Sequence, residues 1–412
     1  MQRNVRRMLV LGAVISIAGA CSNSSEVMSE ADISATTAET AISVESSVPT
    51  APESTDAPTT TSTSMPTTTT EPPVRHVRTV FSGDVLVHSS IWKRAQRYAG
   101  SYDAYDFAPM FTTLEPIVGD ADLAICHLEV PIAPEGEEPQ TYPRYGAPRE
   151  IVDGIAAAGY DRCSTASNHT FDQGREGIYT TVEALLEAGL TQSGMARNAE
   201  EDIPQILEIN GVKVAHIAYT RGYPTVNVPD DAPWLTNSLE VENVLADART
   251  ARELGAEIVI ISCHWGTEPQ SPVTATQRDQ AEAITASGLV DLIVGHHTHV
   301  VQPIEQVNGV WTVFGMGNSI SNMPVGPYPP ASQDGALVQV DFDVAADGSV
   351  TVHQPVVYPT WVDKGDTFAI MDVLTELARP DLSAYRRAQM EISLERTRSV
   401  VGEFVASAPY AG

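Results

Sequence analysis

Histidines gather directly after two apolar segments in the second half of the chain. Residues 258–262 are apolar up to a serine and lead into Cys-His-Trp-Gly (263–266), while residues 292–294 lead into Gly-His-His-Thr-His (295–299). Between them, residues 275–287 have a helical pattern that ends before a glycine. Strands of an open parallel sheet bring their carboxyl ends to one edge, where neutral imidazoles could bind a divalent transition metal. Ordinary loop histidines are the alternative, which three histidines within four residues disfavour.

Other apolar segments also end in side chains that can bind metals. Asp84, Glu129 and Asn168 each follow a different predicted strand in the first half of the folded region. With His264 and the histidines of 295–299 they form a mixed set of oxygen and nitrogen ligands. Such a set could hold two ions about 3.5–4 Å apart.

The elements that must position these side chains indicate an α/β domain. Three predicted helices end at glycines and are each followed by an apolar strand, which is typical of layered α/β folds; the glycines are Gly159, Gly255 and Gly288. Further strands are predicted to pair as antiparallel hairpins through Asn-Gly or Asp-Gly turns; these turns lie at 210–211, 308–309 and 347–348.

Six segments in fixed order carry a resemblance to a known family. They read FSGDV (81–85), HLEVP (127–131), ASNHTFDQG (166–174), HWGTE (264–268), GHHTHVVQPIE (295–305) and FGMGN (314–318). The pattern resembles the CapA family of poly-γ-glutamate capsule synthesis proteins, which look like distant members of the calcineurin-like metallophosphoesterase fold. The resemblance covers residues 77–361. It implies a layered α/β/β/α sandwich of metallo-dependent phosphatase type, with mixed sheets inside and helices outside.

The resemblance also implies roles for individual residues. The metal ligands would be Asp84, Glu129, Asn168, His264, His297 and His299. His169 would act as a general acid or stabilise developing charge, oriented by Asp172. An equally weighted reading of Asp172 is an N-cap of the helix that begins near Gly174.

Four further residues are expected to contact substrate or shape its pocket. They are Trp265, Glu268, His296 and Asn318. His296 is expected to point away from His297 and His299, because neighbouring residues of an extended chain face opposite sides.

The sequence departs from the family pattern at several positions. His127 and Ser167 stand where the family usually has asparagine, which puts fine substrate specificity in doubt. Phosphoesterases of this fold begin with Asp-x-His, whereas Leu86 follows Asp84 at that spacing, and His88 is expected to point elsewhere. One metal position is therefore a ligand short. The expected cofactor is one or two divalent ions of manganese, iron or zinc.

Composition limits the partners of the chain. A net charge of −29 over 412 residues argues against binding of nucleic acid. Cys126, Cys163 and Cys263 lie in or beside apolar segments, so they are expected to be buried thiols without a disulfide framework. Metal binding by Cys263 is a weaker alternative.

The N-terminal region looks like a targeting segment and a tether. Residues 1–21 resemble a bacterial lipoprotein signal with Cys21 as the lipid-modified residue, and a plain secretory peptide is the alternative. Residues 22–75 are rich in Ser, Thr and Pro and are expected to be disordered. A CapA/metallophosphoesterase-like domain would span 76–365, with a C-terminal helical extension over 366–412. The protein is thus expected outside the cytoplasm, held to the membrane by its lipid anchor alone.

The function expected from the resemblance is that of a metal-dependent hydrolase of the cell envelope. It would serve synthesis, export or anchoring of an anionic polymer or peptide of the poly-γ-glutamate type, together with capsule-synthesis partner proteins. Two alternatives stay open. The chain could bind polymer through its metal site without catalysis, or use the same site for peptide epimerisation.

Overall fold

The computed structural model describes residues 73–223 and 226–412. The signal segment, Cys21 and nearly all of the predicted tether lie outside the described residues, so those expectations stay predictions. Within the described part of the chain, no helix is both long and apolar enough to span a membrane.

Two mixed sheets form the centre of the structure. The first has the strand order β15-β14-β12-β1-β2-β3-β4, with β11 beside β1 and β13 beside β12. Its strands are β1 (Arg75–Val85), β2 (Leu123–Leu128), β3 (Arg162–Ser164), β4 (Thr191–Ser193), β11 (Asn318–Ile320), β12 (Asp334–Val344), β13 (Val350–Val352), β14 (Val356–Val362) and β15 (Ile370–Asp372). Strands β1 to β4 are parallel, whereas β12 runs antiparallel to β1.

The second sheet has the order β5-β6-β7-β8-β10-β9. Its strands are β5 (Ile206–Ile209), β6 (Val212–Thr220), β7 (Ile258–His264), β8 (Leu292–His296), β9 (Ile304–Val307) and β10 (Val310–Val313). Strands β6, β7 and β8 are parallel, so their carboxyl ends lie at one edge. The three predicted hairpins are confirmed as the antiparallel pairs β5–β6, β9–β10 and β12–β13.

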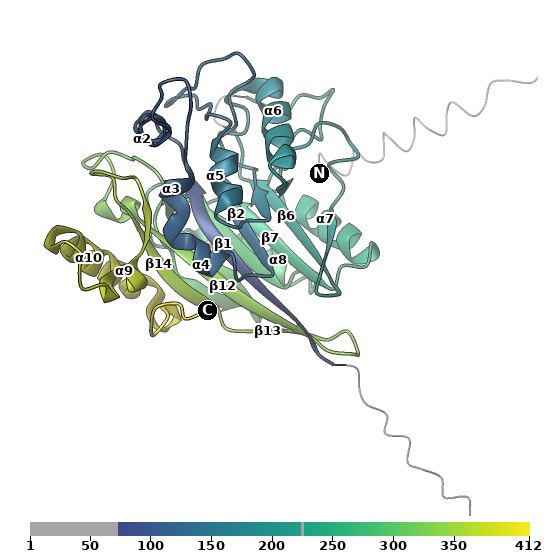
Figure 1. Cartoon of the computed structure of the whole chain (residues 1–412). Helices are drawn as coiled ribbons and strands as arrows, with labels where there is room; N and C mark the ends of the chain where they lie inside the picture. The colour runs from purple at the N-terminus through teal and green to yellow at the C-terminus, as the bar shows by residue number, and fades with distance from the viewer. Residues whose placement is uncertain (1–72, 224–225) are drawn as a thin grey trace, which may run out of the picture. The chain divides into compact units, whose positions relative to one another are not determined.

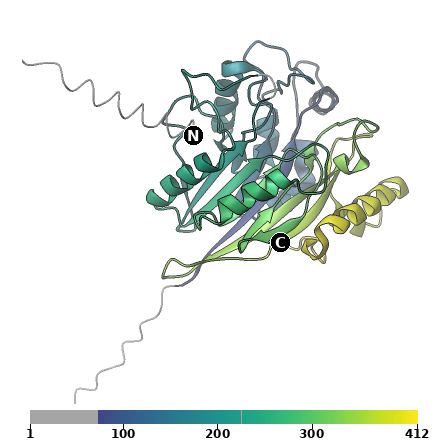
Figure 2. The same ribbon diagram turned by 180° about the vertical axis from the view of Figure 1, so that it is seen from behind.

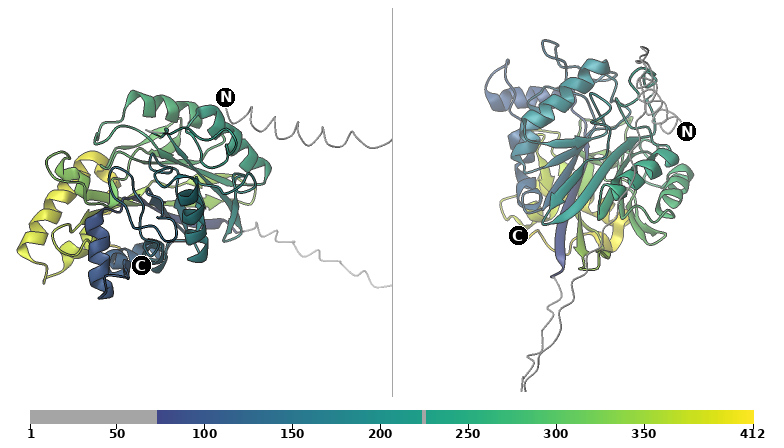
Figure 3. Two further views of the ribbon diagram at one scale, coloured as in Figure 1. Left: turned by 90° about the horizontal axis from the view of Figure 1, so that it is seen from above. Right: turned by 90° about the vertical axis from the view of Figure 1, so that its right-hand side faces the viewer.

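Helices cover the outer face of each sheet. On the first sheet lie α2 (Ser89–Ala99), α3 (Ala108–Phe111), α4 (Glu115–Val118), α5 (Ile151–Ala157) and α6 (Gly174–Glu187). On the second lie α7 (Val241–Glu253) and α8 (Ala275–Thr285). Figure 1 shows the first group and Figure 2, from behind, the second. The right panel of Figure 3 shows the sheets between them. The expected α/β/β/α arrangement is thus confirmed.

Strand β7 shows why its sequence is apolar without interruption. Ile258 and Ile260 belong to the core between the two sheets, whereas Val259 and Ile261 pack with α7 and α8. A strand buried on both faces has no polar side. The pattern changes at Ser262 and His264, which are buried polar residues on the face that looks towards the first sheet. Polar groups therefore replace apolar ones at the carboxyl edge.

The C-terminal segment packs against the first sheet. It contains β15, α9 (Val373–Ala378) and α10 (Ala384–Val401). Arg396 of α10 forms two hydrogen bonds of 2.6 Å with the carboxylate of Asp334 in β12. After α10, the backbone N–H of Ala406 donates to the carbonyl of Val357 in β14. These contacts fix α10 to two strands of the sheet.

The expectation that the described cysteines are free thiols is wrong for two of them. Cys126 of β2 and Cys163 of β3 form a disulfide. They are paired residues of adjacent parallel strands, so the two side chains project to the same face of the sheet and can meet. Cys263 is buried and unpaired, as expected.

Candidate metal centre

The carboxyl ends of four strands converge on one buried cluster of polar side chains. Asp84 is the last residue but one of β1, His264 is the last of β7, and His296 is the last of β8. Glu129 follows directly after β2. Asp84 and Glu129 are completely buried. The parallel sheets therefore bring together side chains that are far apart in the sequence.

Three groups of three residues have the spacing of metal ligands, and two of them share Glu129. One consists of Asp84, Glu129 and His299, and the other of Glu129, His264 and His297. Within each group the potential ligand atoms lie within 4.8 Å of one another. Glu129 belongs to both groups. Its Oε1 lies 3.9 Å from Nε2 of His264 and 3.6 Å from Nε2 of His299. A carboxylate in this position can bridge two ions.

The bonding of Glu129 fits a bound cation. Both of its carboxylate oxygens are buried, and neither has a hydrogen-bond partner among the described residues. Burial raises the pKa of Glu129 well above its ordinary value. An unpaired buried carboxylate is costly, and a metal ion would remove that cost. Nδ1 of His297 is also buried without a hydrogen-bond partner, whereas Oδ2 of Asp84 lies 3.0 Å from Nδ1 of His299.

Asn168 lies beside the group that contains His264. Its Oδ1 is 2.9 Å from Nε2 of His264. In the metal-free protein this distance is that of a hydrogen bond to the amide oxygen, and the same oxygen would be close enough to bind an ion held by His264. The structure thus places Asn168 where an amide oxygen could complete the group of Glu129, His264 and His297.

The backbone that carries His297 and His299 is unusual. Their φ angles are 91° and 56°, in the left-handed region that non-glycine residues rarely adopt. Such strain persists where surrounding structure holds it, often at functional sites. Asn318 is part of that support: its Oδ1 lies 3.0 Å from Nδ1 of His299, and its Nδ2 donates to the His299 carbonyl. When His299 donates from Nδ1 to this oxygen, Nε2 is left free to bind a metal.

Charge within the cluster shifts several pKa values. Burial raises the pKa of Asp84, but the hydrogen bonds and charges of the surrounding histidines outweigh it, so the pKa falls below its ordinary value. Burial lowers the pKa of His299, but the negative charges of Glu129 and Asp84 outweigh it and raise the pKa to about 10. Burial lowers the pKa of His297 to about 3. The pKa of His264 is also lowered, chiefly by burial.

His169 and Asp172 lie together, outside these ligand groups. Nδ1 of His169 is 2.7 Å from Oδ2 of Asp172. The same oxygen accepts a 2.7 Å hydrogen bond from the backbone N–H of Tyr145, whose ring meets that of His169 edge-on. The N-cap reading of Asp172 is wrong: α6 begins after Gln173, without a capping side chain.

The four predicted substrate contacts differ in their surroundings. Glu268 faces the cluster, with Oε1 3.6 Å from Nδ1 of His297 and Oε2 3.8 Å from Nε2 of His299. Trp265 and Asn318 are completely or almost completely buried. Trp265 stacks on Phe314 and donates to its carbonyl. Trp265 thus packs beside the site and Asn318 holds His299, and a contact of either residue with substrate stays a prediction.

His296 also differs from the expectation. Its Nδ1 lies 3.6 Å from Oδ1 of Asp84, so its ring points into the cluster. Within β8 the alternation holds, because Leu292 and Val294 on the same face belong to the core between the sheets; the chain leaves the extended conformation only at His297 and His299. Leu86 is part of the apolar core. His88 bonds to Leu86, Asn322 and Tyr145 instead of to the ligand groups, as expected.

Sequence reasoning missed one residue in the centre of the cluster. His127 is completely buried on β2, with Nε2 3.0 Å from Nδ1 of His264 and 3.9 Å from Oδ1 of Asp84. It also belongs to a third possible ligand group, with Asp84 and His264. The available signal was its position two residues before Glu129, which places both side chains on one face of the strand.

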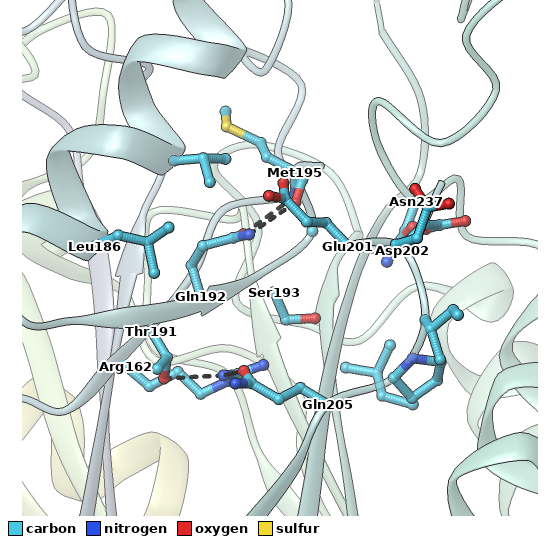
Figure 4. A pocket seen from close by; sticks show the side chains of 16 residues that line it. Arg162, Leu186, Thr191, Gln192, Ser193, Met195, Glu201, Asp202, Gln205 and Asn237 are labelled. Atoms are coloured by element: carbon cyan, nitrogen blue, oxygen red, sulfur yellow. Dashed lines mark hydrogen bonds between the residues drawn. The ribbon is translucent and has the colours of Figure 1, made fainter. Parts of the chain in front are cut away.

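A separate cavity of about 390 Å³ lies away from these ligands (Figure 4). Its lining includes Arg162, Thr191 and Gln205 but none of the candidate ligands. Burial lowers the pKa of Arg162 to about 9. The guanidinium donates to Thr191, Gln205 and the carbonyl of His216. Arg162 therefore joins the two sheets through neutral acceptors.

Solved structures similar to this chain include two phosphoesterases. A calcineurin-like phosphoesterase from Bacillus subtilis is 16% identical, with 79% of this chain and 98% of that chain covered and a TM-score of 0.46. A phosphatase from Mycoplasma pneumoniae is also 16% identical, with 70% and 94% covered and a TM-score of 0.42.

Sequence relatives lead to a more specific family. The capsule biosynthesis protein CapA of Bacillus anthracis is 25% identical over 65% of this chain and 65% of its own length. The PGA biosynthesis protein CapA of Bacillus subtilis is 23% identical over 74% and 79%. The match therefore spans about two thirds of the first relative. The model of the bacterial capsule synthesis protein PGA_cap family matches residues 78–323. With more than half of its length matched, the chain belongs to this family.

Proposed function

We propose that this protein is a metal-dependent hydrolase of the cell envelope that acts on a capsular anionic polymer of the poly-γ-glutamate type. The observation that carries the proposal is the position of Glu129 between two ligand groups, with both carboxylate oxygens unpaired. A polymer-binding protein without catalysis would have no need of a second, separate pair such as His169 and Asp172 beside the ligands.

The polymer is suggested by the relatives. Both Bacillus relatives are named for capsule or PGA biosynthesis. The net charge of −29 makes binding of a polyanion by the surface as a whole unfavourable. Bound cations at the candidate centre would offset that repulsion locally. We also propose that the protein works together with partner proteins of capsule synthesis.

The location is proposed from the disulfide and the N-terminal sequence. Disulfides persist in oxidising compartments and are rare in the cytoplasm, and Cys126 and Cys163 form one. The lipoprotein-like segment 1–21 would then export the chain and attach it to the membrane through Cys21. The active domain would act on polymer outside the cytoplasm.

The first proposed task of the clustered residues is to bind two metal ions. Asp84 and His299 would hold one divalent ion, while Asn168, His264 and His297 would hold a second, with Glu129 shared. Bound ions of manganese, iron or zinc supply Lewis acidity and lower the pKa of water. Leu86 stands where phosphoesterases of this fold have a histidine. The ion held by Asp84 and His299 would therefore have one protein ligand fewer. Glu268 is placed to contact either an ion or the substrate.

His169 would transfer the proton. Asp172 holds Nδ1 of the ring, which leaves Nε2 as the nitrogen that can donate a proton to a leaving group. Tyr145 packs against the ring and its backbone N–H fixes the Asp172 carboxylate. A general acid positioned in this way contributes typically 10²–10⁴-fold to a rate.

The test combines metal content with turnover by the exported domain from about Arg75 to Gly412. We expect about two ions per chain after loading with manganese or zinc, and hydrolysis of phosphodiester or γ-glutamyl model substrates. His169→Ala should abolish most turnover and leave metal content unchanged. Metal binding with no turnover by the wild type on either substrate class would favour a polymer-binding protein, and interconversion of peptide stereoisomers would favour an epimerase. Absence of metal after loading would overturn the proposal.

A further inference from the structure

We infer that His127 is a positioning residue, which holds His264 in the tautomer that can bind a metal. This inference rests on the proposed function, because it assigns His264 as a ligand. His264 lies between two partners: Nε2 is 2.9 Å from Oδ1 of Asn168, and Nδ1 is 3.0 Å from Nε2 of His127. A neutral imidazole has one N–H, so the partner of Nδ1 decides which nitrogen is free.

The hydrogen bonds beyond His264 form a continuous chain. Nδ1 of His127 lies 2.7 Å from Oγ of Ser164, and that hydroxyl is 3.3 Å from the carbonyl oxygen of Cys126. With the metal-binding tautomer, His264 donates to Nε2 of His127, His127 donates from Nδ1 to Ser164, and Ser164 donates to the carbonyl. Every donor in this series of hydrogen bonds then has an acceptor. In this direction the network leaves Nε2 of His264 free for an ion, whereas in the metal-free protein Nε2 can donate to Oδ1 of Asn168 and the network runs the other way.

The ring of His127 is held firmly in this position. It stacks on His296 with centroids 4.0 Å apart and an interplanar angle of 18°. His127 and Ser164 are paired residues of β2 and β3, directly next to the disulfide between Cys126 and Cys163. Strand register and the covalent bond therefore fix the distance between them.

A ligand role for His127 is the competing explanation. His127 forms a third group with Asp84 and His264 whose spacing would suit an ion. However, both ring nitrogens already lie within hydrogen-bond distance of protein groups, whereas the oxygens of Glu129 have no hydrogen-bond partner among the described residues. The bonding therefore favours positioning for His127 and metal binding for Glu129.

The chain offers a matched control. His216 of β6 is also completely buried and neutral, and its Nε2 lies 2.8 Å from Oγ of Ser262 on the neighbouring strand. Its other ring nitrogen accepts from Arg162 rather than contacting a candidate ligand. Substitutions at His216 report the general cost of removing a buried histidine–serine pair.

The experiment measures Co²⁺ and Mn²⁺ binding by calorimetry, together with the Co²⁺ absorption spectrum, for His127→Leu, His127→Gln, Ser164→Ala and His216→Gln. His127→Leu should lower the affinity for one of the two ions 10–100-fold and alter the Co²⁺ absorption spectrum. His127→Gln, which can still accept from His264, should recover most of the affinity. Ser164→Ala should have a smaller effect in the same direction, and His216→Gln should change affinity less than about twofold. The disulfide and thermal unfolding check that each variant is folded.

Two results would overturn the inference while the proposed function stands. One is a folded His127→Leu variant whose metal affinity and Co²⁺ spectrum equal those of the wild type. If His127→Leu does not fold, the same result in Ser164→Ala would count against the inference. The other is complete loss of one ion in both His127→Leu and His127→Gln, which would identify His127 as a ligand. Absence of metal binding by the wild type would instead overturn the proposed function itself.

Discussion

Oδ2 of Asp172 lies 2.7 Å from Nδ1 of His169, and this pair stands beside the ligand cluster without being part of it. The separation predicts that catalysis and metal binding can be changed independently. Asp172→Asn should lower kcat by about 10²-fold or more, because the imidazole loses the carboxylate that orients it. Metal stoichiometry should stay at the wild-type value. The test is to measure kcat and metal content on the same preparation of Asp172→Asn. An equal loss of kcat and of bound metal would contradict the prediction that catalysis and metal binding can be changed independently.

Substitution of Glu129 should instead weaken metal binding. Because Glu129 is shared by both ligand groups, Glu129→Gln should weaken both ions, by at least about 100-fold, which exceeds the usual cost of an indirect contact. Glu257→Gln is the control, since Glu257 pairs with Arg75 and belongs to none of the ligand groups. Calorimetric titration with Mn²⁺ measures both. Retention of one ion at full affinity in Glu129→Gln would show that this carboxylate does not bridge.

The sequence predicts which polar side chains gather in the cluster better than it predicts their surroundings. Asp84, Glu129 and His264 follow apolar strands whose parallel pairing brings their ends together, so their proximity follows from local pattern. The disulfide between Cys126 and Cys163 depends instead on the register of two strands 37 residues apart, which the sequence does not specify. Equally, nothing in the sequence around Tyr145 indicates its contact with His169, which depends on how a loop folds over the site.

The directions of His297 and His299 could not be predicted for a related reason. Strand alternation places neighbouring side chains on opposite faces, but that rule ends where the strand ends. At His297 the chain turns to a φ of 91°, and His296 and His299 both approach Asp84. Backbone strain of this kind arises from tertiary contacts, such as those of Asn318 with His299, and is invisible in local sequence patterns.

Metal binding should release a proton from His299. In the metal-free protein the carboxylates of Asp84 and Glu129 hold the pKa of His299 at about 10, so the ring is protonated near neutral pH. A ligand histidine must be neutral, so each ion bound there displaces about one proton. Apparent affinity should therefore rise about tenfold per pH unit below this pKa. Calorimetry in buffers of different ionisation enthalpy measures the release, and a heat independent of the buffer would contradict it.

The metal-free fold should lose stability as the pH falls below about 6.5. Burial lowers the pKa of His88 from an ordinary value of 6.5 to about 4 and also lowers that of His216. The unfolded chain therefore binds more protons between these values, so this contribution to stability is present above pH 6.5 and is lost as the pH falls towards 4. Thermal unfolding across this range should show the loss, and His88→Gln should flatten the curve. An unchanged slope in that variant would rule His88 out as a source.

The disulfide should contribute substantially to the stability of the sheet beneath the ligands. It closes a loop between Cys126 and Cys163, which are 37 residues apart, and constraint of the unfolded chain by such a loop is worth about 2–4 kcal/mol. The double variant Cys126→Ala, Cys163→Ala should lower the free energy of unfolding by about that amount in urea titrations. Cys263→Ala is the control for loss of a buried sulfur, because Cys263 is unpaired. A reductant should destabilise the wild type but not the double variant. If reduction leaves the urea midpoint of the wild type unchanged, the disulfide is absent in solution, and the support it gives to export and to the fixed spacing of His127 and Ser164 is lost with it.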